Sequence, residues 1–99
     1  MVEEIAESLI KFGFICSTID KNETVFISNS KINIKHKTSD NDIFYLFPVQ
    51  DKIEIWADKK TDVVTLRVFQ HETEMLYLRN TISVQDGKIF IGENYLFKP

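Results

Sequence analysis

The first stretch of the chain has apolar and polar residues at the spacing of an α-helix. One side carries the apolar residues Val2, Ile5, Ala6, Leu9, Ile10 and Phe12, and the other carries Glu3, Glu4, Glu7 and Lys11. The acidic residues come first and the lysine last, which suits the helix dipole, and Gly13 follows as a C-terminal stop. The pattern predicts an amphipathic helix that ends before Gly13.

After this helix the pattern becomes typical of β-strands. Short segments rich in β-branched and aromatic residues are predicted as strands at 24–27, 31–37, 43–47, 53–57, 63–69, 81–84, 88–91 and 95–97, and residues 14–16 are a candidate start of a further strand. Segment 71–80 can be read as a strand or as a short helix, and we favour a strand.

Turn signals between these segments predict how neighbouring strands connect. Asn29-Ser30 and Asp51-Lys52 are candidate hairpin turns. The glycines at 87 and 92 divide the last part of the chain into a three-stranded meander. Such short connections join antiparallel neighbours, because parallel crossovers need a dozen or more residues.

The sequence therefore predicts a single domain, 1–99, of the α+β class. Its architecture is an N-terminal amphipathic helix packed on a curved, mainly antiparallel sheet of about six to eight short strands. A helix of about 12 residues is only about 18 Å long and cannot cover a wide sheet. Either the sheet rolls partly into a barrel, or its second face meets another chain.

Composition limits the class of protein and the cellular compartment that we expect for this domain. An apolar fraction of 43% is globular, and no apolar run approaches the roughly 20 residues that span a bilayer, so we expect no membrane contact. The acidic start is unlike a signal peptide, and a lone cysteine, Cys16, makes no internal disulfide. We expect a cytoplasmic protein. The net charge of -3 leaves nucleic-acid binding to a local basic patch.

Residue patterns for catalysis are weak. Three glycines are too few for a phosphate loop, and carboxylate pairs in a chain with 15 acidic residues have no specificity. Cys16 lies among apolar neighbours, which favours a small core residue over a nucleophile. His36 shares a strand face with Ile32 and Ile34 and is interpreted as structural. We expect no catalytic residue, no metal ligand and no cofactor, and the chain is interpreted as a non-enzyme.

Strand alternation places several aromatic residues on faces that should be polar. With Ile53 and Ile55 facing the core, Trp56 lies on the opposite face, and Tyr45 and Phe90 belong to strands that are apolar on both sides. Tryptophan and tyrosine are favoured anchors of contact surfaces. The first hypothesis is a small non-catalytic protein-interaction or accessory subunit, in a homodimer or a hetero-complex, with Trp56, Tyr45 and Phe90 in the contact.

The strand 31–37 suggests a second hypothesis. Lys31, Lys35 and Lys37 alternate with Ile32 and Ile34, so they form a basic stripe along one face. Such lysines either protect a strand from edge-to-edge aggregation or bind phosphate. The alternative function is thus a nucleic-acid-associated factor. A third, a small-ligand-binding or enzymatic domain, has no motif behind it, and we expect no small-molecule ligand.

Overall fold

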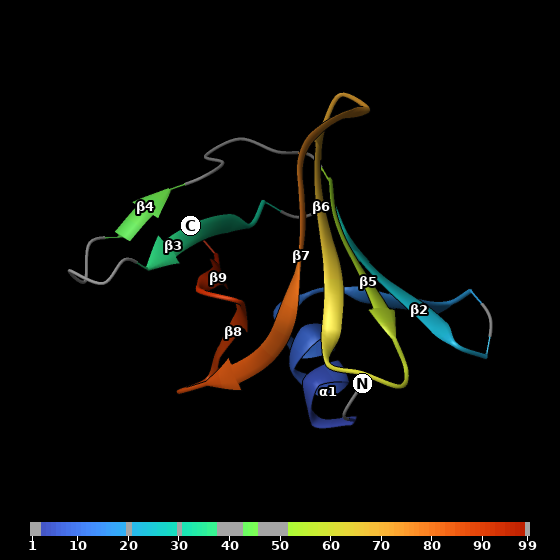
Figure 1. Cartoon of the computed structure of the whole chain (residues 1–99). Coiled ribbons are helices and arrows are strands. Elements are labelled where there is room, and N and C mark those ends of the chain that lie inside the picture. Colours follow the sequence, from blue (N-terminus) through green and yellow to red (C-terminus); the bar gives the residue numbers. More distant parts are fainter. Residues whose placement is uncertain (1–2, 20, 30, 38–42, 46–51, 99) are drawn as a thin grey trace.

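A computed structural model gives the fold, and it describes residues 3–19, 21–29, 31–37, 43–45 and 52–98, with the backbone alone for residues 37 and 43–45. The described chain has one helix, α1 (Glu3–Phe12), and nine strands (Figure 1). In chain order the strands are β1 (Ile15–Thr18), β2 (Glu23–Ser28), β3 (Asn33–Lys37), β4 (Ile43–Tyr45), β5 (Lys52–Asp58), β6 (Val63–Gln70), β7 (Thr73–Gln85), β8 (Lys88–Ile91) and β9 (Asn94–Phe97).

The strands pair in the order β1-β2-β5-β6-β7-β8-β9-β3-β4, and every pair is antiparallel. The helix and the antiparallel sheet confirm the α+β prediction at that level. The described strands exceed the predicted six to eight, and the sheet is open and not strongly curved, with β1 and β4 at its edges. β7 is the longest strand; its first part pairs with β6 and its last part with β8.

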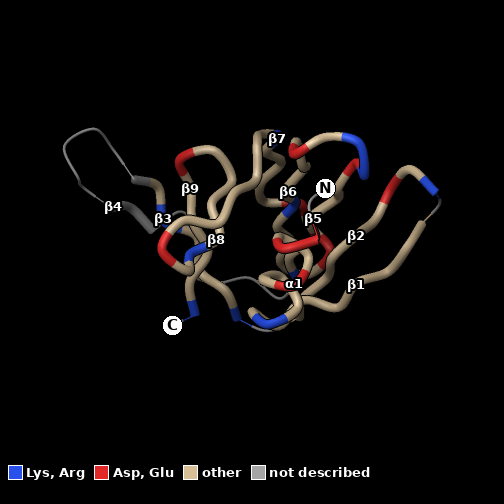
Figure 2. The backbone as a smooth tube through the Cα atoms, turned by 90° about the horizontal axis from the view of Figure 1, so that it is seen from below, with Lys and Arg blue, Asp and Glu red and all other residues tan. Residues whose placement is uncertain are grey.

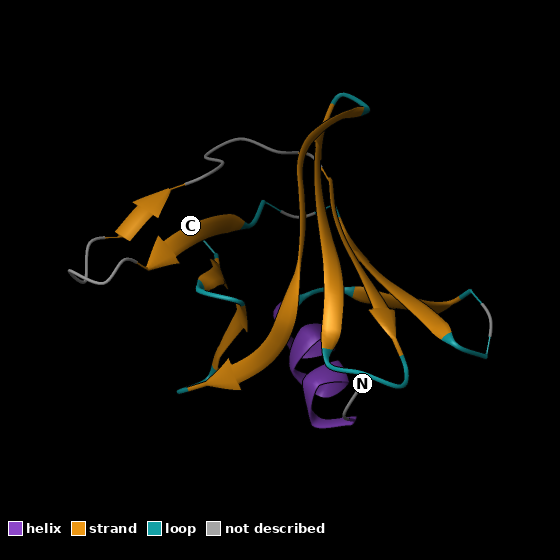
Figure 3. Cartoon of the chain, viewed as in Figure 1, coloured by secondary structure: helices purple, strands orange, loops and turns teal. Residues whose placement is uncertain are grey.

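The helix lies against one face of the sheet (Figure 3). Its buried residues are Ile5 and Leu9, four positions apart and therefore on the same side of the helix. Gly13 ends it with a φ of 122°, and its N–H donates to the carbonyls of Leu9 and Ile10. The predicted helix and its stop are confirmed. No helix in the described part of the chain is long and apolar enough to cross a membrane.

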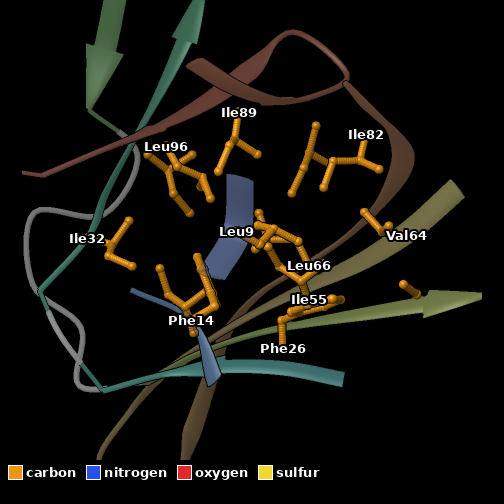
Figure 4. Packing of buried hydrophobic residues seen from close by; sticks show 14 of the residues in the cluster. Leu9, Phe14, Phe26, Ile32, Ile55, Val64, Leu66, Ile82, Ile89 and Leu96 are labelled. Atoms are coloured by element: carbon orange, nitrogen blue, oxygen red, sulfur yellow. The ribbon is translucent and has the colours of Figure 1, made fainter. Parts of the chain in front are cut away.

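The hydrophobic core lies between α1 and the sheet, with Leu9 at its centre (Figure 4). Side chains from six consecutive strands of the sheet order surround Leu9: Phe26, Ile55, Val64 and Leu66 come from β2, β5 and β6, and Ile82, Ile89 and Leu96 come from β7, β8 and β9. All are at most 2% exposed. Ile32 and Ile34 also face the core, as the alternation of strand 31–37 predicts.

Two predicted hairpins are wrong. Ser30 and Asp51 lie outside the described residues, but the strand pairing excludes both hairpins. β2 does not pair with β3, because it pairs with β1 and β5. β5 does not pair with β4, because it pairs with β2 and β6 while β4 pairs with β3. A strand in a sheet has only two edges: β2 and β5 pair with each other along one edge, and their other edges are occupied by β1 and β6.

The second half of the chain follows the sequence prediction more closely. Segment 71–80 is a turn followed by strand, which confirms the strand interpretation, and β7, β8 and β9 form the predicted meander. The tight turns are Asp86-Gly87 between β7 and β8 and Gly92-Glu93 between β8 and β9. Local signals succeed here because each strand pairs with its neighbour in sequence.

Candidate functional site

The face of the sheet that points away from α1 carries Trp56. Ile53 and Ile55 on β5 are completely buried on the helix side, so alternation turns Trp56 to the outer face, as predicted. The indole is half-buried, and no described helix lies over it. Its cross-strand neighbours are Val25 on β2 and Thr65 on β6. We call the outer side of β2, β5, β6 and β7 the tryptophan face.

A polar network fixes the orientation of the indole. Trp56 Nε1 donates a hydrogen bond of 2.9 Å to Glu54 Oε1. Glu54 is only 9% exposed, and its carboxylate lies 3.4 Å from Lys52 Nζ and 3.6 Å from Arg67 Nη1. A largely buried carboxylate needs such partners, since burying an unpaired charge is costly. Glu54 is thus an anchor that limits the rotamers of Trp56.

Arg67 extends this network toward β7. Its Nε donates to Glu74 Oε1 at 2.7 Å. This hydrogen bond raises the pKa of Arg67 above its ordinary value; desolvation lowers it, and the negative charges of Glu74 and Glu54 add to the rise. The guanidinium also lies 5.0 Å from the ring centroid of Phe69. The centre of the tryptophan face is therefore an ordered array of charges.

Next to the indole the surface is hollowed into an open groove of about 220 Å³. Its lining is mostly polar and consists of Asn22, Glu23, Trp56, Asp58, Thr65 and Arg79. Arg79 Nη1 donates to Thr65 Oγ1 at 3.2 Å, and Glu23 lies directly opposite Asp58 in the β2–β5 register. The groove combines one aromatic wall with charged groups of both signs.

Exposed apolar side chains lie at both ends of one row across this face. The row runs through Ile15, Ile27, Glu54, Arg67 and Tyr77, each opposite the next in the strand register. Ile15 is 72% exposed and Tyr77 is 64% exposed. The sequence analysis did not single out either residue, although the alternation of Tyr77 with the half-buried Leu76 and Leu78 is visible in the sequence.

Phe90 lies on a different part of the sheet, among β8, β9 and β3. Its ring centroid is 5.3 Å from that of Tyr95, which in turn is 6.3 Å from that of Phe97. The strand register places Phe90, Tyr95 and Lys35 in one row, and the Cα of Tyr45 follows Lys35 in that row. Trp56 is therefore separated from Phe90 and Tyr45, which the sequence analysis had grouped with it.

Lysines lie over these rings. Lys35 Nζ is 4.1 Å from the centroid of Phe97, and Lys88 Nζ is 5.0 Å from that of Tyr95. Lys31 is exposed, and Lys37 occupies the last position of β3. We call the outer side of β3, β8 and β9, with Phe90, Tyr95, Phe97, Lys35 and Lys88, the aromatic–lysine face. Sequence analysis missed Tyr95, Phe97 and Lys88, although their period-two spacing in 88–90 and 95–97 was a usable signal.

Cys16 and His36 were considered as candidates for catalysis. Cys16 is exposed on β1, so the prediction of a core cysteine is wrong; β1 is a short edge strand whose side chains are all exposed. His36 Nδ1 lies 2.9 Å from Asn94 Oδ1, a contact that links β3 to β9. No group of three metal-ligating side chains converges among the described residues.

Comparisons with known proteins add nothing to this geometry. No protein-family model, no curated protein and no solved structure matches the chain. Function is therefore inferred from the two faces themselves.

Proposed function

We propose that this protein is a small non-catalytic interaction module whose contact surface for a protein partner is the tryptophan face. The observation that carries this proposal is Trp56: a half-buried indole, held by a hydrogen bond to Glu54, on a sheet face with no described helix over it. Complete burial of Trp56 would have argued against a contact role, and it is not completely buried.

The arrangement of this face supports a protein contact. Tryptophan and tyrosine supply most of the binding energy in many interfaces, and both Trp56 and Tyr77 are available on this face. Binding also costs the rotamer freedom of the side chains that become fixed, at about 0.5–1.5 kcal/mol each. The bond to Glu54 already restricts the indole, which reduces that cost. The charged groups around it suit a polar rim.

The groove beside Trp56 is a concave part of this surface. Its lining combines an indole wall with the carboxylates of Glu23 and Asp58 and the guanidinium of Arg79. A partner side chain that enters it meets both apolar surface and charge, which is the usual composition of a specific polar rim around an aromatic anchor. The partner is a second copy of this chain or another protein.

The test is a native pull-down of the tagged full chain, with and without nuclease, with sedimentation velocity to detect self-association. Trp56→Ala is the decisive variant, Trp56→Phe retains an aromatic ring, and Ile10→Ala is a control at an exposed apolar position on the helix. We expect Trp56→Ala to weaken the association by at least about 2 kcal/mol, roughly 30-fold, with the fold intact by circular dichroism.

Two results would contradict the proposal. A partner that Trp56→Ala and wild type retain equally would place the contact elsewhere on the molecule. A chain that stays monomeric and retains no protein after nuclease treatment would overturn the interaction role.

A further inference from the structure

The aromatic–lysine face has the residue types that bind unpaired bases. Phe90, Tyr95 and Phe97 form a continuous series of rings across β8 and β9, with centroid separations of 5.3 and 6.3 Å. Phe90 and Phe97 are half-buried, so part of each ring remains accessible, whereas Tyr95 between them is only 7% exposed and supports the two outer rings from below. Aromatic rings on a sheet surface are platforms on which successive bases stack.

The charges on this face complement a phosphate backbone. Lys35 and Lys88 extend over the rings of Phe97 and Tyr95, and Lys31 is exposed two positions before β3. The positions of β3, β8 and β9 on this face include no acidic residue; the nearest acidic residues in sequence, Asp86 and Glu93, lie in the turns. Figure 2 shows the lysines of β3 and β8 on the same half of the molecule.

A bound base would take the place of a lysine on an aromatic ring. An ammonium group over an exposed ring is a weak contact, and a base stacked on the same ring is a stronger one. When a base takes the place of Lys35 on Phe97, the lysine ammonium stays close to the bound nucleotide and can contact its phosphate. Both halves of a nucleotide are then bound by groups that already lie together.

A hydrogen-bond acceptor lies beside the rings. Asn33 is opposite Phe97 in the β3–β9 register and is 7% exposed, and its Oδ1 has no hydrogen-bond partner among the described residues. Buried polar atoms in native proteins are nearly always paired. An N–H group of a base stacked at Phe97, such as N3–H of thymine, is a donor of the kind that this oxygen needs.

We propose that the aromatic–lysine face binds single-stranded nucleic acid, with a site of about two or three nucleotides over β8, β9 and β3. A duplex hides the faces of its bases in the stack, so accessible aromatic rings favour single strands. This site is separate from the tryptophan face and does not depend on the protein-interaction role proposed above.

The test is fluorescence anisotropy of the full chain with a labelled ten-nucleotide oligothymidylate. Three lysine–phosphate contacts on a single strand give a slope of log affinity against log salt of about -2, or roughly a 20-fold loss between about 50 and 200 mM salt. The double variant Lys35→Gln/Lys88→Gln should reduce the slope to about -0.7. The matched control Lys59→Gln/Lys60→Gln, in the exposed β5–β6 turn, should leave the slope and the affinity unchanged.

The contribution of the rings is measured separately. Phe97→Leu keeps the hydrophobic volume but removes the ring face, and we expect roughly a tenfold loss of affinity with the salt slope unchanged. Trp56→Ala should retain oligothymidylate binding, so failure of the interaction role would not imitate failure of this site. Duplex DNA of equal length should compete poorly.

Three outcomes would overturn the proposal. One is the absence of binding at low salt, and another is an equal loss in the control variant. The third is effective competition by inorganic polyphosphate together with an unaffected Phe97→Leu variant, which would show general attraction of polyanions. The expected pattern in all variants would establish the site.

Discussion

Two hairpin turns of this sheet share a backbone conformation but not their residues. In the β7–β8 turn Asp86 and Gly87 have φ values of 52° and 76°, and in the β6–β7 turn His71 and Glu72 have φ values of 49° and 67°. Two-residue hairpins with both central φ angles positive strongly favour Asn-Gly or Asp-Gly. The β6–β7 turn therefore holds two residues in a conformation that their side chains disfavour.

The cost of this conformation can be worked from the two turns. A residue with a side chain in the left-handed region costs roughly 1–2 kcal/mol, and asparagine and glycine avoid most of that cost. Glycine reduces this gain by about 0.5–1 kcal/mol, because the unfolded chain is more flexible at a glycine and loses more conformational entropy on folding. The double variant His71→Asn/Glu72→Gly should thus raise the free energy of unfolding by about 1.5 kcal/mol, which corresponds to roughly 6–12 °C in Tm.

Urea and thermal unfolding followed by circular dichroism measure this change. The reciprocal variant Asp86→His/Gly87→Glu is the matched control and should lower the stability by a similar amount, because it installs the disfavoured pair in the same conformation. Glu72→Gly alone isolates one of the two positions. Unchanged or lower stability in the His71→Asn/Glu72→Gly variant, with a neutral reciprocal swap, would refute the strain argument.

Two further predictions concern Gly92 and Cys16. A Cβ at Gly92 would lie 2.5 Å from Asn80 Nδ2 at a φ of 60°, so Gly92→Ala should cost about 2 kcal/mol, whereas Gly87→Ala, with no atom within 4 Å, should cost about 1 kcal/mol for its φ alone; chemical denaturation compares them. Equal losses would contradict the steric part. Cys16 should react with Ellman's reagent in the folded protein as fast as after denaturation, and Cys16→Ser should change stability by less than about 0.5 kcal/mol; a thiol that reacts only after unfolding would contradict its exposure.

Periodicity in the sequence was sufficient to predict which face of the sheet a side chain occupies, but not which strands pair with one another. Ile53, Ile55 and Trp56 were assigned to the correct sides of β5 because alternation is a local property. Asn29-Ser30 has the composition of a hairpin turn, but β2 pairs with β5, and no local signal reports that competition. Cys16 has apolar neighbours, yet it lies on an edge strand, where such neighbours do not imply burial.

The same limit explains what was missed at the candidate sites. Lys35 and Phe90 were recognised separately, as members of different hypotheses. They belong to one surface because β3 pairs with β9, which is about 60 positions later, and β9 pairs with β8. That register also brings Tyr95 into the row between them. Interpretation of single strands identified candidate residues, and only the strand order could group them.

The pairing of β3 with β9 also has a consequence for the synthesis of the protein. β3 is synthesised about 60 residues before β9, and until residues 94–97 exist Ile32 and Ile34 have no β9 surface, including Leu96, to pack against. Contacts between distant parts of a chain slow folding, because a long loop must close before the contact is made. The core around Leu9 can be completed only after β9 has emerged, so Ile32 and Ile34 lack part of their packing in the nascent chain until then, a state that favours aggregation.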